Sequence, residues 1–465
     1  MEISTTLISG NEDETAVFAE SYSGDFSLVF RFNLGISQPL STSSRIVACF
    51  HEIEVDDENK TFSDRESMRQ GIYDLISHVW PLCASNPSLR FPDAIVHIQQ
   101  DDHGETTFRI SHERVFRDYL TSLLPISSIK DSLIPPARTT ELHCISLESL
   151  RFSDKLGGRG GTTLTRLKDQ KAGGAYVYKG LSFRLFLEGN TVYKPERDIF
   201  YRELGVVYSL PSHPNILCAP PFLVITGLPR SVNHGIAEKV DLVCGTLYPY
   251  LERQSLQEVI SRSNENHSSL PLATKAKWAC QISSAMAIVH SSGQYHMDLK
   301  PSNMLLNNED DVIIIDWEQC GASPFFLAPE ADGSWDVDVF INAEKERMVY
   351  RKFIGPLCDD FGAWPKRNVF QLWQLECRRA LEAAEVYSVG RSLWVIFEQS
   401  EDVWSYDRRP PEAKEVAWTQ RSESVPKAWK DFVSRCLSPD PNERPKFEQG
   451  ERFWRQEFVP IAFKD

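Results

Sequence analysis

Residues 295–318 read YHMDLKPSNMLLNNEDDVIIIDWE, and this stretch decides how the rest of the chain is interpreted. Its apolar run Val-Ile-Ile-Ile ends at Asp316; Asn303 stands thirteen residues earlier and Asp298 five before that. Two aspartates and an asparagine at this spacing can hold a divalent metal ion and a hydroxyl nucleophile around one nucleoside triphosphate. Phosphoryl transfer needs mainly positioning and charge neutralisation. The stretch therefore predicts a phosphoryl-transfer site.

The octapeptide HMDLKPSN (296–303) resembles the catalytic loop of eukaryotic protein kinases, and IDWE resembles the strand and metal-binding turn that follow it. Further stretches resemble other motifs of that family, in the family's order. They are YVYKG (176–180), FYREL (200–204), HPNIL (213–217), LAPE (327–330), EVYSVGRSLWVIFE (385–398) and RCLSPDPNERP (435–445). The resemblance covers about residues 150–465. It implies an α+β, bilobal protein-kinase-like fold, with a β-rich small lobe and a mainly helical large lobe.

The resemblance also implies a role for each matched residue of the central stretch. Asp298 would orient and deprotonate the substrate hydroxyl. Lys300 would approach the transferred phosphate, and its presence in Asp-Leu-Lys-Pro is typical of Ser/Thr rather than Tyr substrates. Asn303 and Asp316 would ligate Mg2+. ATP and Mg2+ are therefore the expected cofactors, and a protein the expected substrate.

The same resemblance places the ATP-binding residues upstream. Lys179 would hold the α- and β-phosphates and would itself be held by Glu203, 24 residues later. Lys194 is a rival, but nine residues before Glu203 leave too little room for a strand, a turn and half a helix. Aligned without gaps, Leu251 would supply the hinge N–H to adenine.

The expected glycine loop, LGGRGGTTLTRL (156–167), fits no register of the family's three glycines with the usual aromatic residue. Glycine backbone can still approach phosphates closely, and a flexible turn is the alternative. The candidate phosphate-binding glycines are Gly157, Gly158, Gly160 and Gly161.

Two further features depart from the family around the catalytic loop. Met297 stands where most members have an Arg that pairs with a phosphate on the activation loop, so activation by loop phosphorylation is not expected. Glu318 replaces the glycine of the metal-binding turn, which removes backbone freedom and adds a negative charge near the metal. Only eleven residues separate Glu318 from Glu330, and Ser323 is the only hydroxyl among them.

The large lobe has its own expectations. Glu330 should form a structural ion pair with Arg444. Glu385 stands where the family has Asp, in a buried bracing role. About 55 residues separate Glu330 from Glu385, several times the usual gap, which predicts an insert at about 332–380. These features resemble a divergent branch of kinase-like proteins common in filamentous fungi.

Residues 1–140 form a separate acidic region. They hold 21 Asp and Glu against 11 Lys and Arg, most of the chain's net charge of -15. Strands are expected at 26–32, 45–55 and 94–110, and helices at 63–80 and 112–124. Ile-Pro-Pro-Ala-Arg-Thr-Thr (134–140) reads as a linker. The predicted organisation is a small α+β N-terminal module at 1–140, a small lobe at 141–250 and a large lobe at 251–465.

Composition narrows the partners and the compartment. A net negative chain without a Lys/Arg-rich run disfavours nucleic acid and anionic membrane surfaces. No apolar stretch reaches 18 residues, and the first residues do not read as a secretory signal. Ten scattered cysteines without a Cys-x-x-Cys pair indicate reduced thiols in a cytoplasmic or nuclear protein. The acidic module is, as a hypothesis, a docking surface for a basic protein partner.

Three functions fit these observations. The first is an active, non-RD protein serine/threonine kinase. The second is a pseudokinase or scaffold that binds partners through the N-terminal module and the insert, because of the irregular glycine loop and Glu318. The third is a small-molecule phosphotransferase, which shares the Asp, Asn and later Asp. Such enzymes lack the LAPE element and the Arg444 element.

Overall fold

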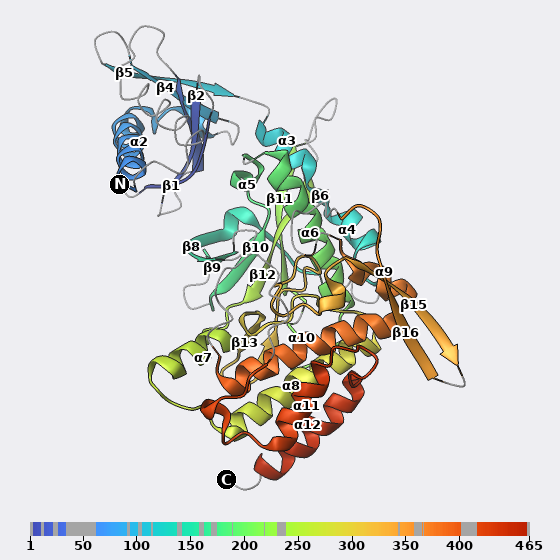
Figure 1. Cartoon of the computed structure of the whole chain (residues 1–465). Coiled ribbons are helices and arrows are strands. Elements are labelled where there is room, and N and C mark those ends of the chain that lie inside the picture. The colour runs from blue at the N-terminus through green and yellow to red at the C-terminus, as the bar shows by residue number, and fades with distance from the viewer. Residues whose placement is uncertain are drawn as a thin grey trace. The chain divides into compact units, whose positions relative to one another are not determined.

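The chain divides into two compact units. The first comprises residues 1–129, 141–197 and 220–250, and the second comprises 130–140, 198–219 and 251–465. Figure 1 gives the element labels on the computed structural model. The structure describes residues 3–10, 14–21, 27–33, 62–90, 94–100, 105–112, 115–136, 142–157, 162–168, 174–187, 189–217, 219–229, 239–342, 345–357, 365, 367–400 and 416–462.

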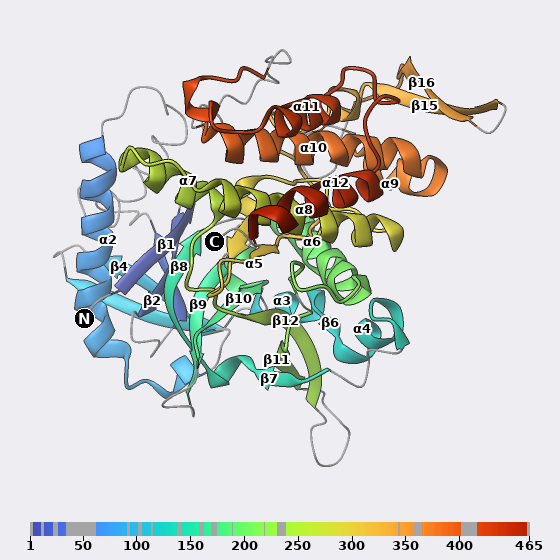
Figure 2. The same cartoon turned by 90° about the horizontal axis from the view of Figure 1, so that it is seen from below.

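A five-stranded sheet and a long helix form the N-terminal part of the first unit. The strand order is β1-β2-β3-β4-β5. In this sheet β3 and β4 are the parallel pair, and the connection between them includes helix α2, as the crossover of a parallel pair requires. Figure 2 shows α2 alongside these strands. The elements are β1 (Ile3–Gly10), β2 (Glu14–Ser21), β3 (Ser27–Asn33), α2 (Phe62–Cys83), β4 (Ala94–Gln100) and β5 (Thr106–His112).

The core of this part follows from two sequence periods. Ile72, Ile76 and Val79 recur at helical spacing on α2 and pack against Val96 and Ile98, which alternate along β4. The predicted helix at 63–80 and strands at 26–32 and 94–110 are confirmed. Strands β1 and β2 were not predicted, and the strand expected at 45–55 lies outside the described residues.

The rest of the first unit is built on a seven-stranded sheet of order β7-β11-β12-β10-β9-β8, with β6 also paired to β12. Short helices α3 (Val115–Ser122), α4 (Ile126–Ser132), which continues into the second unit, and α5 (Phe183–Leu187) accompany it. The strands are β6 (Leu124–Pro125), β7 (Cys144–Ser146), β8 (Leu150–Gly157), β9 (Thr162–Leu167), β10 (Tyr176–Gly180), β11 (Phe222–Pro229) and β12 (Lys239–Pro249).

Two glycines fix the packing of β10. Gly180 and Gly245 face each other across β10 and β12. A Cβ atom added to Gly245 would lie only 2.3 Å from a ring carbon of Tyr178, so a side chain at this position would clash with the ring. The Tyr178 hydroxyl donates to the carbonyl of Cys244 at 3.1 Å. Successive strand side chains point to opposite faces, so Lys179 projects to the face opposite Tyr178.

The second unit is mainly helical. Helix α8 packs against α10 and α12, and α10 packs against α11 (Figure 1). Every residue of α10 from 383 to 398 is buried, which confirms the expected buried central helix. The helices are α6 (Asn190–Ser209, from residue 198), α7 (Leu256–Glu265), α8 (Leu272–Ser291), α9 (Val369–Glu376), α10 (Arg378–Glu398), α11 (Lys427–Cys436) and α12 (Phe447–Ala462).

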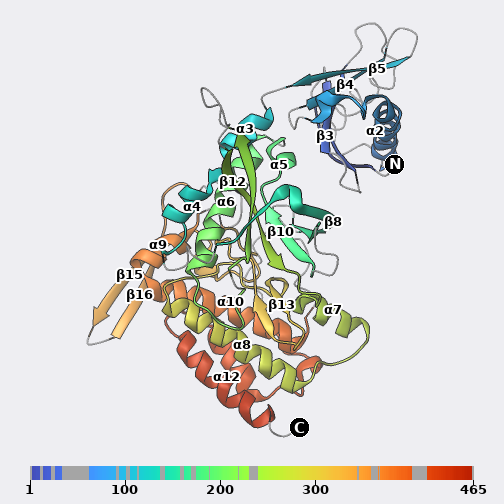
Figure 3. The same ribbon diagram turned by 180° about the vertical axis from the view of Figure 1, so that it is seen from behind.

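Two hairpins complete this unit. Strands β13 (Met304–Leu306) and β14 (Val312–Ile314) follow the candidate catalytic loop. Strands β15 (Trp335–Asn342) and β16 (Lys345–Lys352) lie in the predicted insert, beside α9 (Figure 3). Alternate residues of this hairpin, such as Val337, Val339 and Tyr350, pack on the core that contains Trp373. The described part of the insert therefore consists of a hairpin and a helix.

Seven cysteines lie in the described ranges, and none of these forms a disulfide bond; five are buried and Cys144 is exposed. Burial raises the pKa of the Cys244 and Cys436 thiols to about 12. Across the same ranges, none of the helices combines the length and apolar character needed to cross a lipid bilayer.

Candidate functional site

The β13–β14 hairpin brings the two candidate metal ligands to one end of the second unit. Met304 pairs with Ile314, and the N–H of Ile315 donates to the carbonyl of Asn303 at 3.0 Å. Asp316 follows directly, with a left-handed backbone (φ 69°). A non-glycine residue in this region costs on the order of 1–3 kcal/mol and is typical of functional sites. The pairing of β13 with β14 thus explains why Asn303 and Asp316 lie close together although thirteen residues separate them in the sequence.

The carboxylate of Asp298 accepts three hydrogen bonds. Its Oδ2 accepts from Lys300 Nζ at 2.5 Å and from Asn303 Nδ2 at 3.2 Å, and its Oδ1 accepts from the N–H of Ser323 at 2.9 Å. Asn303 Nδ2 also donates to the carbonyl of Asp298 at 2.9 Å. The structure therefore brings Asp298, Lys300 and Asn303 together, as the sequence predicts.

His296 connects this loop to the strand before Asp316. Its Nδ1 accepts from the N–H of Asp298 at 3.2 Å, so Nε2 carries the proton and donates to the carbonyl of Ile315 at 2.8 Å. The ring is fully buried and packs against Trp317, with centroids 4.6 Å apart. These contacts make His296 a core residue that holds the catalytic loop to the strand before Asp316.

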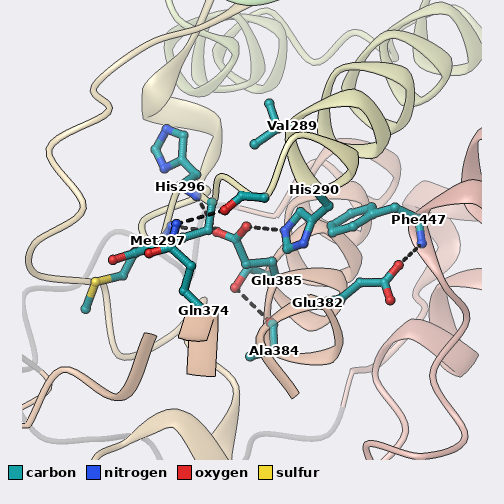
Figure 4. Close-up of polar contacts among 12 residues, drawn as sticks. Val289, His290, His296, Met297, Gln374, Glu382, Ala384, Glu385 and Phe447 are labelled. Atoms are coloured by element: carbon teal, nitrogen blue, oxygen red, sulfur yellow. Dashed lines mark hydrogen bonds and ion pairs between the residues drawn. The ribbon is translucent and has the colours of Figure 1, made fainter. Parts of the chain in front are cut away.

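Glu385 supports the loop from the buried helix α10 (Figure 4). Its Oε1 accepts from the N–H groups of His296 and Met297, at 2.8 and 2.5 Å, and its Oε2 lies 2.6 Å from His290 Nε2. The side chain is fully buried. Met297 has a left-handed backbone (φ 80°), which these bonds stabilise. The bracing role predicted for Glu385 is confirmed.

Sequence reasoning missed His290 as the partner of Glu385. His290 lies in the last turn of α8, in a stretch that reads as an apolar core helix. A single polar residue at the end of such a helix carries no signal of its partner, because the contact spans 95 residues of sequence.

The ion pair predicted between LAPE and the C-terminal arginine is present. Arg444 holds both oxygens of Glu330, at 2.5 and 3.1 Å, and donates further to the carbonyls of Ser438 and Ala383. Arg444 also lies over the ring of Tyr387. A buried pair whose remaining donors are satisfied in this way is structural.

The ATP-binding candidates belong partly to the first unit. Lys179 lies on β10, and its carbonyl accepts from Thr246 Oγ1. Glu203 is buried on α6, within the second unit, so the predicted pairing of Lys179 with Glu203 stays a prediction. Leu251 lies two residues after the end of β12. Gly157 pairs with Thr162 across β8 and β9, while Gly158, Gly160 and Gly161 lie outside the described residues.

The donor set fits a hard divalent cation. The nitrogen of the Asn303 side chain donates to Asp298, so its amide oxygen can serve as a metal ligand, and Asp316 would supply a carboxylate oxygen. Oxygen ligands of this kind suit Mg2+ bound together with substrate phosphates. Among the described residues no group of three or more His, Cys, Asp or Glu side chains could form a metal site by itself.

A braced catalytic loop, a hairpin that joins Asn303 to Asp316, and a buried carboxylate–arginine pair are features that protein kinases share. Residues 158–323 match the family model "Protein kinase domain". This segment is similar to the eukaryotic protein kinase superfamily, and the sheet-rich first unit and mainly helical second unit fit that family's α+β bilobal fold.

Several curated kinases are similar to parts of the chain. The mitogen-activated protein kinase kinase kinase mlk-1 of Caenorhabditis elegans is 26% identical over 220 residues, which cover 44% of this chain and 19% of the relative. A probable serine/threonine-protein kinase of Dictyostelium discoideum is 22% identical over 258 residues, 55% of this chain and 20% of the relative. The kinase kinase kinase mom-4 of C. elegans is 32% identical over 107 residues, 23% of this chain and 17% of the relative. The chain thus spans a fifth or less of each relative's length.

Proposed function

We propose that the chain transfers the γ-phosphoryl group of ATP to Ser or Thr hydroxyls of proteins. The observation that supports this most is the bonding of Asp298. Lys300 and Asn303 both donate to Oδ2, whereas among the described residues only the N–H of Ser323 donates to Oδ1, so one lone pair of Oδ1 can accept a substrate hydroxyl.

Each residue has a part in this reaction. Asp298 orients the hydroxyl and takes its proton. Lys300, beside Asp298, offers a positive charge for the transferred phosphoryl group. Asn303 and Asp316 would hold Mg2+, which when bound neutralises phosphate charge. Lys179 would hold the other phosphates, with Glu203 as its partner.

The test compares the wild-type chain with Asp298→Asn. Purified chain is incubated with labelled ATP, Mg2+ and casein, and phosphate incorporation is measured. Asn keeps the shape of the side chain but cannot act as the base, so incorporation should fall by about two to four orders of magnitude. Incorporation that is absent, or equal in the two proteins, would contradict the proposed activity.

A second candidate is a scaffold that binds ATP without transferring phosphate. Glu318 supports it, because this buried carboxylate lies two residues after Asp316, where an added negative charge opposes the charge neutralisation that phosphoryl transfer needs. Calorimetric titration with ATP and Mg2+, for the wild-type chain and Asp316→Asn, distinguishes the two. Binding that needs Asp316, without incorporation, favours the scaffold.

A further inference from the structure

Gln319 occupies an unusual position three residues after Asp316. It is buried and has a left-handed backbone (φ 53°). A glutamine adopts this conformation only where its surroundings hold it. The Nε2 of Gln319 donates to the carbonyl of Tyr295 at 2.8 Å, three residues before Asp298. The side chain thus ties the segment after Asp316 to the catalytic loop.

The backbone carbonyl of Gln319 is held from two other elements. It accepts from Arg202 Nη1 on α6 and from Asn368 Nδ2 in the insert, both at 3.3 Å. The Oδ1 of Asn368 accepts from the N–H of Phe370 and thereby caps α9. Gln319 is therefore the point at which the catalytic loop, α6 and the insert meet.

Four residues further along, Ser323 transmits this constraint to Asp298. Its N–H donates to Asp298 Oδ1, and its carbonyl accepts from the N–H groups of Phe326 and Leu327, both at 3.0 Å. The stretch from Gln319 to Ser323 is thus held at both ends. With Oδ2 occupied by two donors, the Ser323 bond decides which way the remaining lone pair of Oδ1 points.

We propose that Gln319 is a positioning residue which, through Ser323, orients Asp298 without any phosphate on this segment. The proposal rests on the proposed kinase function. Met297 cannot pair with a phosphate, and Ser323 is the only hydroxyl between Asp316 and Glu330. The hydrogen bonds of Gln319 with Tyr295, Arg202 and Asn368 take over the anchoring that a phosphate and an arginine would provide. The insert contributes to this anchor through Asn368.

The experiment uses the full chain, treated with phosphatase, and three variants. Gln319→Leu removes the bond to Tyr295, and Gln319→Glu keeps the length of the side chain but replaces its N–H donor. Gln374→Leu is the matched control, because Gln374 Nε2 also donates to a backbone carbonyl, that of Gly293, at 2.8 Å. The readouts are kcat and KM with ATP, Mg2+ and casein, and hydrogen exchange of the Ser323 amide.

The dephosphorylated wild type should retain its activity. Both Gln319 variants should lose kcat on the order of tenfold to a hundredfold, with KM for ATP nearly unchanged, since a misoriented base affects the chemical step. Their Ser323 amide should exchange faster, while Gln374→Leu should resemble the wild type. Gln319 variants that match Gln374→Leu in both readouts, or a wild type inactivated by phosphatase, would overturn the proposal.

Failure of the proposed kinase function has a separate signature. In that case the wild type transfers no more phosphate than Asp298→Asn. The exchange of the Ser323 amide then decides the positioning role: faster exchange in the Gln319 variants supports it, and unchanged exchange refutes it. A thermal unfolding curve of each variant confirms that the chain is folded.

Discussion

At the scale of single residues, Glu385 shows how one buried carboxylate sets the shape of the catalytic loop. It receives two backbone N–H groups and lies beside His290, in a site closed to water. Charge-assisted bonds of this kind are stronger than neutral ones, and they offset the strain at Met297. The position of Asp298, the next residue, depends on this support.

We expect Glu385→Ala to lower the free energy of unfolding by about 3–5 kcal/mol, because two buried backbone N–H groups and the half-buried His290 lose their partner. Urea denaturation measures the change. Glu382→Ala is the control: Glu382 lies one turn earlier on α10 and bonds Arg379 and the N–H of Phe447, but it is partly exposed. Its removal should cost about 1 kcal/mol. Equal losses in the two variants would contradict the special role of Glu385.

Lys275 is a second buried charge, remote from the reaction. Its Nζ donates to the carbonyl of Phe397 at 2.8 Å, and burial lowers its pKa to about 8, against an opposing contribution from Glu398. Between this value and the ordinary 10.5 the unfolded chain binds more protons than the folded chain. This group therefore adds stability as pH rises from about 8 to about 10.5.

We expect the wild type to gain stability relative to Lys275→Met by on the order of 1–3 kcal/mol between pH 7.5 and 10. Denaturant unfolding at several pH values gives the free energy of unfolding of each protein. Groups other than Lys275 titrate in both proteins, so their contributions cancel in the difference between the two. Ser283→Ala, at another buried position of α8, is the control and should differ from the wild type equally at each pH. A pH-independent difference for Lys275→Met would refute the expectation.

At the scale of elements, the sequence predicted residues whose partners are local or belong to a family motif, and it did not predict residues whose partners are distant in the sequence. Asn303 and Asp316 were predicted from their short spacing and the family resemblance, and a local hairpin joins them; Glu330 and Arg444 were predicted as a pair from the resemblance alone. His290 and Gln319 were not predicted, since their partners are set by tertiary packing. For the same reason the insert was placed at 332–380 without its hairpin.

Asn442 fastens that hairpin to the C-terminal arginine element. Its Oδ1 accepts from the N–H of Met348, and its Nδ2 donates to the carbonyl of the same residue, at 2.8 and 3.1 Å. One side chain therefore occupies the outer edge of β16 as a neighbouring strand would. The hairpin is thereby linked to the part of the chain that carries Arg444.

We expect Asn442→Ala to cost about 1–3 kcal/mol, because both Met348 groups lose a partner. Hydrogen exchange of the Met348 amide should accelerate, while the amides of β13 and β14 stay protected. Asn307→Ala is the control: Asn307 Oδ1 caps the turn between those strands by accepting from Glu309 and Asp311. If both variants accelerated the Met348 amide equally, Asn442 would not be the anchor.

At the scale of the whole molecule, the acidic N-terminal region and the small-lobe sheet share residues. Leu124 and Pro125 form β6 and pair with Val243 and Leu242 of β12. The hydroxyl of Tyr119 donates to the carbonyl of Leu181 at 2.6 Å. The predicted module of residues 1–140 therefore includes a segment, 115–129, that is bonded into the other sheet of the first unit.

We expect removal of residues 1–140 to lower the thermal midpoint on the order of 5–10 °C below that of a chain lacking only residues 1–112, because β6 and buried Tyr119 are lost. Differential scanning calorimetry of both truncated chains measures this. Tyr119→Phe in the longer chain isolates the hydroxyl and should account for about 1 kcal/mol. Equal midpoints would show that the boundary at residue 140 is structurally sound.

The chain lacking 1–112 is also the appropriate one for testing whether the acidic region docks a basic protein, because its small-lobe sheet keeps β6. Binding that survives this removal at low salt would exclude that role.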